Sequence, residues 1–264
     1  MLKHKLFNNK VLGLIILFSG NVLLATGPRA ETDRLPTTIA KLKPSIVAVG
    51  TFMAKRNPRA LFLGTGFAVG DGRLVVTNAH VVPNSLDVKH NEELAVFYRQ
   101  GDDEKATLVK LVALDNVHDL AVLKLATGKL VAAQLGKASA VQEGQTYAFT
   151  GFPIGMVLGL YPVTHKAMVS AISPNIIPML AINANNGKAV RQLQQPYDIF
   201  QLDATAYPGN SGSPLYDMET GAVVGIINKT FVQESKENVL SKPSGISYAI
   251  PANYIDKLLN EKKP

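Results

Sequence analysis

Short runs of apolar residues, many of them β-branched, recur along most of the chain and alternate with clusters of glycine, proline and acidic residues. Runs of this length and composition are typical of β-strands, and the clusters between them are typical of turns. We therefore expect strands at residues 45–51, 66–69, 74–77, 94–98, 108–113, 120–125, 146–150, 167–172, 198–203, 213–216, 222–227 and 245–250.

Helical periodicity is scarce in the chain. Residues 36–43 have the pattern of a short helix, and residues 252–261 have that of an amphipathic terminal helix. About six strands in each half, with few helices, favour an all-β fold of two antiparallel six-stranded β-barrels. We expect the first barrel within residues 31–140 and the second barrel, with the terminal helix, within residues 141–264.

The first 30 residues differ from the rest of the chain. Lys3, Lys5 and Lys10 precede a mostly apolar stretch at residues 11–25, and Ala30 is a small residue before a polar start. The apolar stretch is short for a stable membrane span, so residues 1–30 are predicted to be a secretory signal peptide. We therefore expect an exported protein, periplasmic or secreted, that is anchored to a membrane only if residues 11–25 remain uncleaved.

The net charge gives no indication of a nucleic-acid partner. The whole chain carries a formal charge of +7, but residues 1–30 hold four basic residues and no acidic one. The remainder has 23 basic against 20 acidic residues, or +3, which is too little to indicate binding to nucleic acid or to an anionic membrane. Cysteine is absent, so the hydrophobic core has to stabilise the fold without disulfides.

Three short motifs carry the candidate chemistry. Residues 77–80 read TNAH, residues 119–122 read DLAV and residues 209–214 read GNSGSP. They place His80, Asp119 and Ser211 in the chain order of the chymotrypsin-type catalytic triad, which differs from the order in subtilisins and in α/β-hydrolases. Each motif alone fits an ordinary loop, a turn or a core histidine, so the prediction depends on their joint order.

The three side chains have different predicted roles. A serine hydroxyl is a weak nucleophile until a neighbouring base takes its proton. His80 is the candidate base, Asp119 would hold its imidazole in one tautomer, and Ser211 would attack the peptide carbonyl. Gly209 lacks a Cβ, so its backbone can adopt the turn that directs its N–H group toward the oxyanion, beside the N–H group of Ser211. The two N–H groups would form an oxyanion hole. The sequence therefore predicts a serine endopeptidase that acts through an acyl-enzyme intermediate.

These motifs, together with PSIV at residues 44–47, GTGF at 64–67 and GISYAIP at 245–251, resemble the HtrA/DegP family of trypsin-like proteases. The similarity extends over about residues 36–260. It implies a chymotrypsin-like double β-barrel, export in bacteria, and proteolysis without a cofactor or ATP. The family's catalytic residues match His80, Asp119 and Ser211, and its oxyanion-hole position matches Gly209.

The chain departs from the family pattern in two places. Ser213 stands where the family normally has glycine. The active bacterial glutamyl endopeptidases also have serine at this position. The chain also ends at Pro264, so we expect no PDZ domain of the kind that most members use for peptide binding and assembly. The oligomeric state, including a homo-oligomer, is left open.

In this fold the residues six and five positions before the nucleophile, Thr205 and Ala206, lie near the base of the P1 pocket. Neither residue is charged, so the counter-charge for a P1 lysine or arginine is missing. We expect the strand with Ile226, Ile227 and Asn228 to line the pocket and to pair with the substrate backbone. Small or medium apolar P1 side chains are therefore predicted.

Two functions remain open at this point. The leading hypothesis is an exported serine endopeptidase that acts on unfolded or damaged polypeptides in protein quality control. The alternative is a protease-like chaperone or binding protein with latent or little basal proteolysis, because the sequence does not report whether the oxyanion hole is formed. We expect no nucleic-acid partner, no cofactor and no metal, since no pair of histidines has metal-ligand spacing. His118 is expected at the surface or partly buried.

Overall fold

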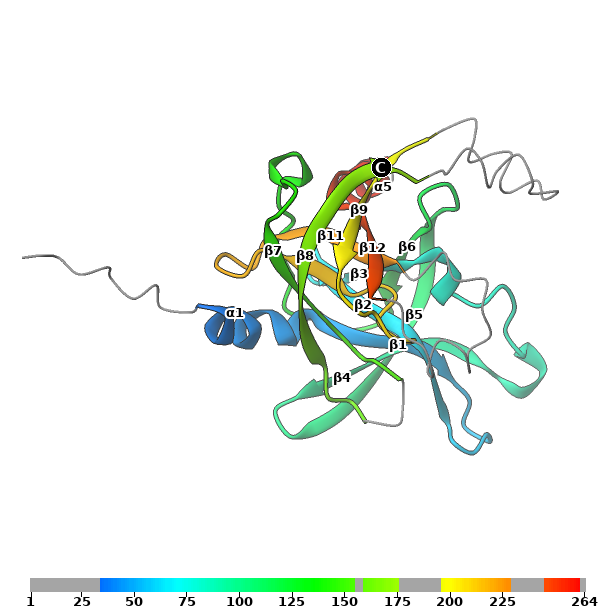
Figure 1. Cartoon of the computed structure of the whole chain (residues 1–264). Helices are drawn as coiled ribbons and strands as arrows, with labels where there is room; N and C mark the ends of the chain where they lie inside the picture. The colour runs from blue at the N-terminus through cyan, green and yellow to red at the C-terminus, as the bar shows by residue number, and fades with distance from the viewer. Residues whose placement is uncertain (1–33, 155–158, 176–195, 229–244, 262–264) are drawn as a thin grey trace, which may run out of the picture. The chain divides into compact units, whose positions relative to one another are not determined.

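The chain folds into two closed antiparallel β-barrels, with a helix near each end of the described region (Figure 1). The computed structural model describes residues 34–154, 159–175, 196–228 and 245–261. The predicted all-β fold of two six-stranded barrels is confirmed. The predicted signal peptide at residues 1–30 lies outside the described residues. Neither of the two described α-helices is long and apolar enough to cross a membrane.

Six strands form the first barrel: β1 (Ile46–Phe52), β2 (Ala60–Val69), β3 (Leu74–Asn78), β4 (Glu93–Gln100), β5 (Asp103–Asp115) and β6 (Leu120–Leu125). They pair in the order β1-β2-β3-β6-β5-β4. Successive side chains of a strand point to opposite faces, and both faces of β1 are buried. Val47 and Val49 belong to the cluster within the barrel, whereas Ile46 and Ala48 belong to a second cluster that extends beyond it.

Six further strands form the second barrel: β7 (Thr146–Gly151), β8 (Val163–Pro174), β9 (Asp198–Asp203), β10 (Pro214–Tyr216), β11 (Val223–Asn228) and β12 (Ile246–Pro251). They pair in the order β10-β11-β12-β9-β8-β7. The side chains of Phe149, Leu202, Leu215 and Ile227 share one cluster and are fully buried. Burial of each such side chain stabilises the fold by about 1.5–3 kcal/mol.

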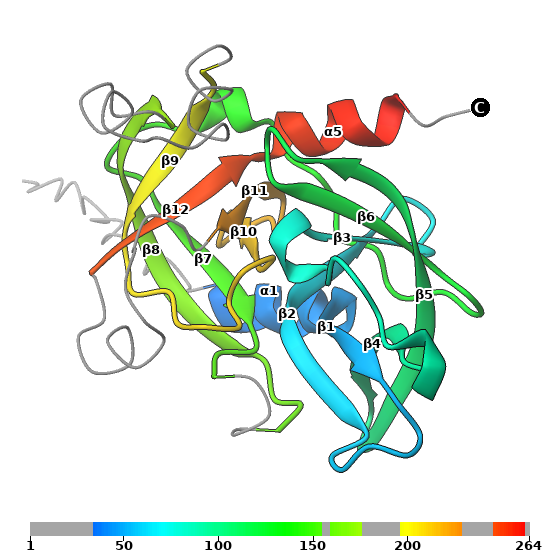
Figure 2. The same ribbon diagram turned by 90° about the vertical axis from the view of Figure 1, so that its right-hand side faces the viewer.

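A shared apolar core joins the two barrels. It contains Phe67 of the first barrel, Ile226 and Ile250 of the second barrel, and Ile255 of the terminal helix α5 (Ala252–Asn260), all with almost no exposed surface. Helix α1 (Leu35–Leu42) packs on the same core. Figure 2 shows α5 across the upper ends of both barrels, close to β11 and β5. The site described below lies where these two barrels meet.

Predicted and observed elements differ mainly in length. Both helices lie within one residue of their predicted bounds, but β5 begins at Asp103, five residues before the predicted start. The first residues of β5 are charged and exposed, and they pair with the end of β4. The hydrophobic pattern marks a strand only where one face is buried, so hairpin ends that extend into solvent are not visible in it.

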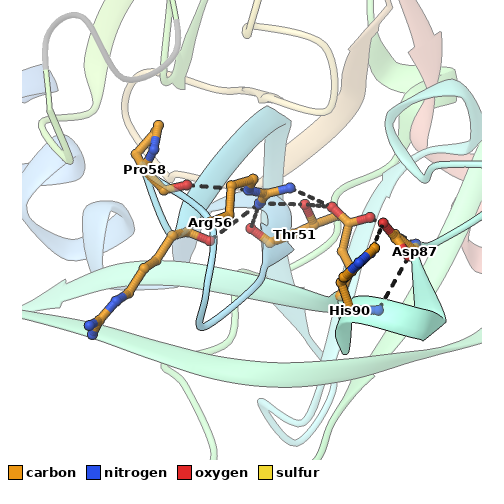
Figure 3. Close-up of polar contacts among 7 residues, drawn as sticks. Thr51, Arg56, Pro58, Asp87 and His90 are labelled. Carbon is orange, nitrogen blue, oxygen red and sulfur yellow. Dashed lines mark hydrogen bonds and ion pairs between the residues drawn. The ribbon is translucent and has the colours of Figure 1, made fainter.

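A half-buried ionic cluster ties the β1–β2 hairpin to residues 87–92 (Figure 3). Arg56 Nη1 donates to Glu92 Oε1 at 2.6 Å, and Arg56 Nη2 donates to the Thr51 carbonyl oxygen at 3.1 Å. Glu92 also accepts from Thr51 Oγ1 at 2.6 Å and from the Asp87 N–H at 3.0 Å. The hydrogen bonds from Asp87 and Thr51 lower the pKa of Glu92 to about 2 despite the opposing effect of burial. Arg56 acts in the same direction.

We expect Glu92→Gln to lower the free energy of unfolding by about 1–3 kcal/mol at pH 7, because several donors lose a charged acceptor. The folded-state pKa of Glu92 lies below its ordinary value of 4.5, so its stabilisation is present above that pH and is lost as the pH falls toward 2. Urea unfolding at pH 7 and at about pH 3 measures both effects. The exposed neighbour Glu93, changed to glutamine, is the control. An equal loss in that control would contradict the prediction.

Candidate active site

His80 and Asp119 lie at the ends of neighbouring strands of the first barrel. The 3₁₀ turn η2 (Ala79–Val81) follows β3 and carries His80, whose side chain is 38% exposed. Asp119 stands directly before β6, which pairs with β3 from Leu120 onward. It has a φ of +53°, a left-handed conformation that aspartate adopts more readily than most residues. Strand pairing and this turn together place Asp119 beside His80.

Asp119 holds the imidazole and the backbone of His80. Asp119 Oδ2 lies 2.6 Å from His80 Nδ1, and Oδ1 accepts from the His80 N–H at 2.9 Å. The Asp119 carbonyl oxygen accepts from the Ala79 N–H at 3.0 Å and from Asn78 Nδ2 at 3.1 Å. A carboxylate bonded to Nδ1 favours the tautomer with the proton on Nδ1, so Nε2 is left as the acceptor that a general base needs.

Asn228 reaches this pair from the second barrel. It is the last residue of β11, and its Nδ2 donates to Asp119 Oδ2 at 3.0 Å. One carboxylate oxygen therefore accepts from both His80 and Asn228. Asn228 is 7% exposed, and hydrogen bonds in such part-buried surroundings hold a side chain in one orientation. The sequence predicts Asn228 as a pocket residue, whereas the structure turns its amide toward Asp119.

Ser211 lies on the loop between β9 and β10, and the first barrel holds this loop through Thr65. Thr65 of β2 donates its N–H to the Ser211 carbonyl oxygen at 2.8 Å and its Oγ1 to the Gly209 carbonyl oxygen at 2.7 Å. The Thr65 carbonyl oxygen in turn accepts from Thr77 Oγ1 at 2.7 Å. Thr65 therefore connects the loop of Ser211 to the strand that leads to His80.

Close packing restricts the residues that follow Ser211. Gly212 has a φ of +89°, and a Cβ there would lie 1.9 Å from the Thr65 carbonyl oxygen, so only glycine fits. The backbone on both sides is bonded to Ile227, which accepts from the Gly212 N–H at 2.9 Å and donates to the Ser213 carbonyl oxygen at 2.8 Å. The Ser213 side chain is fully buried and occupies the space that a Cβ on Gly151 would need.

Among the described residues, no protein acceptor bonds the N–H groups of Gly209 and Ser211. The carbonyl groups of the same two peptide units, those of Pro208 and Asn210, accept from other backbone N–H groups at 2.6 and 3.0 Å. A trans peptide directs its N–H opposite to its C=O, so both N–H groups point away from those partners. They remain available to a ligand, as an oxyanion hole requires.

No hydrogen bond between Ser211 Oγ and His80 is present within the described part of the chain. Ser211 is 4% exposed, whereas the side chain of His80 is far more open to solvent. Catalytic hydrogen bonds are often long in free enzymes and shorten when substrate binds. The structure thus brings His80 and Asp119 into direct contact and places Ser211 on a loop fixed to the same barrel.

The other predicted pocket residues occupy two kinds of surroundings. Thr205 and Ala206 are half-buried in the loop before the nucleophile, and Ala206 packs against the core of the second barrel. Ile226 and Ile227 are fully buried, Ile226 in the core between the barrels and Ile227 in the core of the second barrel. These two side chains therefore pack in the cores beneath the site. Residues 229–244, directly after Asn228, lie outside the described residues.

Thr65 is a site residue whose role is not predicted from the sequence. It stands between Gly64 and Gly66 in an otherwise apolar strand. A Cβ on Gly64 would lie 2.7 Å from a methyl group of Val81, so any residue larger than glycine would force Val81 to move. Glycines within a strand often mark the close approach of another backbone, and a polar residue between two of them could have indicated this contact.

Two of the remaining described histidines each pair with an aspartate a few residues before them. His90 Nδ1 lies 2.6 Å from Asp87 Oδ2, and His118 Nδ1 lies 2.6 Å from Asp115 Oδ2. His165 is partly buried, and burial lowers its pKa. In the residue ranges that the structure describes, no three His, Asp or Glu side chains gather where they could hold a metal ion.

Comparison with known protein families matches residues 64–226 to the trypsin-like peptidase domain. The matched range contains His80, Asp119 and Ser211 and covers more than half of the chain. The chain belongs to the trypsin-like peptidase family. Both barrels contribute to the match, from β2 in the first to β11 in the second.

This trypsin-like peptidase is similar in sequence to HtrA proteins. It is 28% identical to the serine protease HTRA3 of Rattus norvegicus over 242 residues, which cover 89% of the chain and 46% of the relative. It is 31% identical to the probable periplasmic serine endoprotease DegP-like of Halomonas elongata over 189 residues, which cover 72% of the chain and 32% of the relative. The chain therefore spans less than half the length of these relatives.

Solved HtrA-type proteases share the fold of this trypsin-like peptidase. The structure of AlgW with a tripeptide aligns with a TM-score of 0.63 at 24% identity and covers 86% of this chain and 62% of that one. The structure of AlgW with a decapeptide aligns with a TM-score of 0.61 at 23% identity and covers 83% of this chain and 64% of that one. At this level of identity the likeness shows the two-barrel fold.

Proposed function

We propose that this chain is a serine endopeptidase with Ser211 as nucleophile, His80 as general base and Asp119 as the carboxylate that orients the base. The observation that carries the proposal is the 2.6 Å contact between Asp119 Oδ2 and His80 Nδ1, at a carboxylate that Asn228 of the second barrel also bonds. It leaves His80 Nε2 as a proton acceptor at the junction of the two barrels, where Thr65 also holds the loop of Ser211. The names of the HtrA and DegP-like relatives, a serine protease and a serine endoprotease, support this reaction class.

The proposed reaction proceeds in two steps. Ser211 Oγ attacks the carbonyl carbon of the scissile peptide while its proton passes to His80 Nε2, and Asp119 stabilises the imidazolium that forms. The N–H groups of Gly209 and Ser211 bind the oxygen of the tetrahedral intermediate. Collapse of this intermediate releases the amine, which takes the proton from His80. Water then attacks the acyl-enzyme with His80 again as base, and the acid product and Ser211 are released.

We propose unfolded or damaged polypeptides as the substrates, with small or medium apolar side chains at P1. Thr205 and Ala206 bring no charge to the loop before the nucleophile, and an uncharged pocket gives no counter-ion to a P1 lysine or arginine. The peptides in the AlgW structures support a peptide ligand. The periplasmic DegP-like relative supports an exported location, in agreement with the predicted signal peptide at residues 1–30.

Digestion of an unfolded protein and of a mixed peptide library tests both parts of this proposal. We expect the unfolded protein to be cut and its folded form to be spared, because an extended backbone is needed at the junction of the barrels. Mass spectrometry of the new termini should show alanine, valine, leucine or methionine at P1. A strong preference for arginine, lysine or glutamate would contradict the proposed pocket. Intact substrates after incubation with folded protein would contradict the proposed activity.

A further inference from the structure

The turn before Asp119 is closed by the carboxylate of Asp115. Asp115 Oδ1 accepts from the N–H groups of Val117 and His118 at 2.9 and 3.0 Å, and Oδ2 lies 2.6 Å from His118 Nδ1. Burial acts to raise the pKa of Asp115, but the interactions with His118 and the hydrogen bond from Val117 together outweigh it, and the pKa lies below its ordinary value. One carboxylate therefore fixes both the backbone and the ring of His118, the residue next to Asp119.

The ring of His118 packs against two tyrosines. It stacks on Tyr254 of α5 with ring centroids 4.1 Å apart and planes inclined by 21°. It meets Tyr197 at 4.6 Å and 60°, and the two tyrosines contact each other edge to face at 5.4 Å. The side chain of His118 is only 14% exposed. We call His118, Tyr197 and Tyr254 the aromatic cluster.

Both tyrosines come from the part of the chain that builds the second barrel and its terminal helix. Tyr197 directly precedes β9, and its carbonyl oxygen accepts from the N–H of Asn175, just after β8, at 2.9 Å. Burial raises the pKa of Tyr197 to about 12, and the charges of Asp119 and Asp115 act in the same direction. The aromatic cluster thus connects the second barrel to the backbone of Asp119.

Asp119 depends on support from both sides. Its φ of +53° is uncommon for a residue other than glycine, and Leu120, the next residue, is fully buried in β6. With Leu120 held by the core, a shift of His118 would change the backbone angles of Asp119 and turn its carboxylate. The 2.6 Å contact to His80 and the 3.0 Å contact to Asn228 would then lengthen together.

We infer that His118, Tyr197 and Tyr254 are positioning residues for Asp119, which set the orientation in which its carboxylate bonds to His80. The expected effect on the reaction rate rests on the proposed function. These side chains act through Asp119, so their loss should slow the chemical step and leave substrate binding unchanged. In kinetic terms kcat falls and KM stays the same.

Replacement of Tyr254 provides the test with a matched control. Tyr254→Ala removes the ring that stacks on His118, whereas Tyr254→Phe keeps it. We expect Tyr254→Ala to lower kcat about 10-fold with KM within about twofold of wild type, because a displacement of about 1 Å at a reacting group can cost 100-fold. Tyr254→Phe should keep both constants within about twofold, and His118→Ala should resemble Tyr254→Ala.

A second control separates positioning from the stability of the helix. Leu258 lies on the same helix, is 5% exposed and packs in the core between the barrels. Leu258→Ala should lower Tm at least as much as Tyr254→Ala, since it leaves a cavity, yet it should keep kcat at temperatures where the protein is folded. An equal loss of kcat in Leu258→Ala would overturn the positioning role.

The proton NMR resonance of the His80 Nδ1–H, bonded to Asp119, reports on the same geometry without turnover. We expect this resonance to shift or broaden in Tyr254→Ala and to stay unchanged in Tyr254→Phe. An unchanged resonance and a wild-type kcat in Tyr254→Ala would overturn the inference. If the wild-type protein cleaves no peptide, the proposed function is wrong, and the resonance still decides whether the aromatic cluster positions Asp119.

Discussion

Replacing Ser211 with alanine should abolish covalent labelling of the protein by a fluorophosphonate probe and lower peptide hydrolysis by about 10⁶-fold. The probe reports an activated serine, because Ser211 Oγ has to attack phosphorus and expel fluoride while its proton passes to His80. Ser211 Oγ makes no hydrogen bond within the described residues. Removal of this single oxygen should therefore leave Tm almost unchanged.

Ser213→Ala is the matched control for this experiment. Ser213 lies two residues further on, and its buried Oγ also has no partner within the described part of the chain. The control variant should label as fast as the wild-type protein. Persistent labelling of Ser211→Ala would assign the nucleophile to another residue. Failure to label a well-folded wild-type protein would instead favour the alternative of a latent protease-like binding protein.

Replacing Asp119 with asparagine should lower kcat by about 10⁴-fold while the barrels stay folded. The structure supplies the reason, since both carboxylate oxygens accept hydrogen bonds: Oδ1 from the His80 N–H, and Oδ2 from His80 Nδ1 and Asn228 Nδ2. An amide has only one acceptor oxygen. If its NH₂ takes the place of Oδ2, it faces the amide of Asn228 and donates to His80 Nδ1. The proton of the imidazole then moves to Nε2, which can no longer accept from Ser211.

Asp87→Asn is the control for this prediction, because Asp87 forms a similar pair on the surface. Its Oδ2 lies 2.6 Å from His90 Nδ1, and its Oδ1 accepts from the His90 N–H at 3.3 Å. The same chemical change there should alter kcat by less than about twofold. Steady-state kinetics of both variants, with Tm as a check on folding, decide the matter. Similar kcat values for Asp119→Asn and the wild type would remove Asp119 from the proposed mechanism.

Three described histidines are bonded to an aspartate in the same way, which limits what the sequence alone can predict about the site. His80–Asp119, His90–Asp87 and His118–Asp115 all have a nitrogen–oxygen distance of 2.6 Å. A histidine bonded to an aspartate therefore does not by itself identify the candidate catalytic pair. The prediction depends instead on the order of His80, Asp119 and Ser211 along the chain. Within the described part of the chain, only the first pair also receives a hydrogen bond from the second barrel, that of Asn228.

The fold was predictable because burial in the core requires apolar residues at regular positions along each strand. Both faces of β1 and β11 are buried, so their sequences are apolar except for Thr51 in β1 and Asn228 at the end of β11. The contacts across the barrels were not predictable in the same way. Asn228 is 109 residues from Asp119, and Thr65 is 144 residues from Gly209. Periodicity indicates which residues share a face of one strand, but it carries no information on which polar groups meet across such separations.

The bonds made by Thr65 have a consequence for the way the protein is made. A ribosome completes β1 to β6, with His80 and Asp119, well before it reaches Ser211, and domains of a growing chain generally fold as units in that order. The loop of Ser211 gains its partners in Thr65 only when the second barrel has closed and docked on the first. Under the proposed function, hydrolytic capacity therefore arises in the last step of folding. An unfinished chain would then lack a complete site throughout its synthesis.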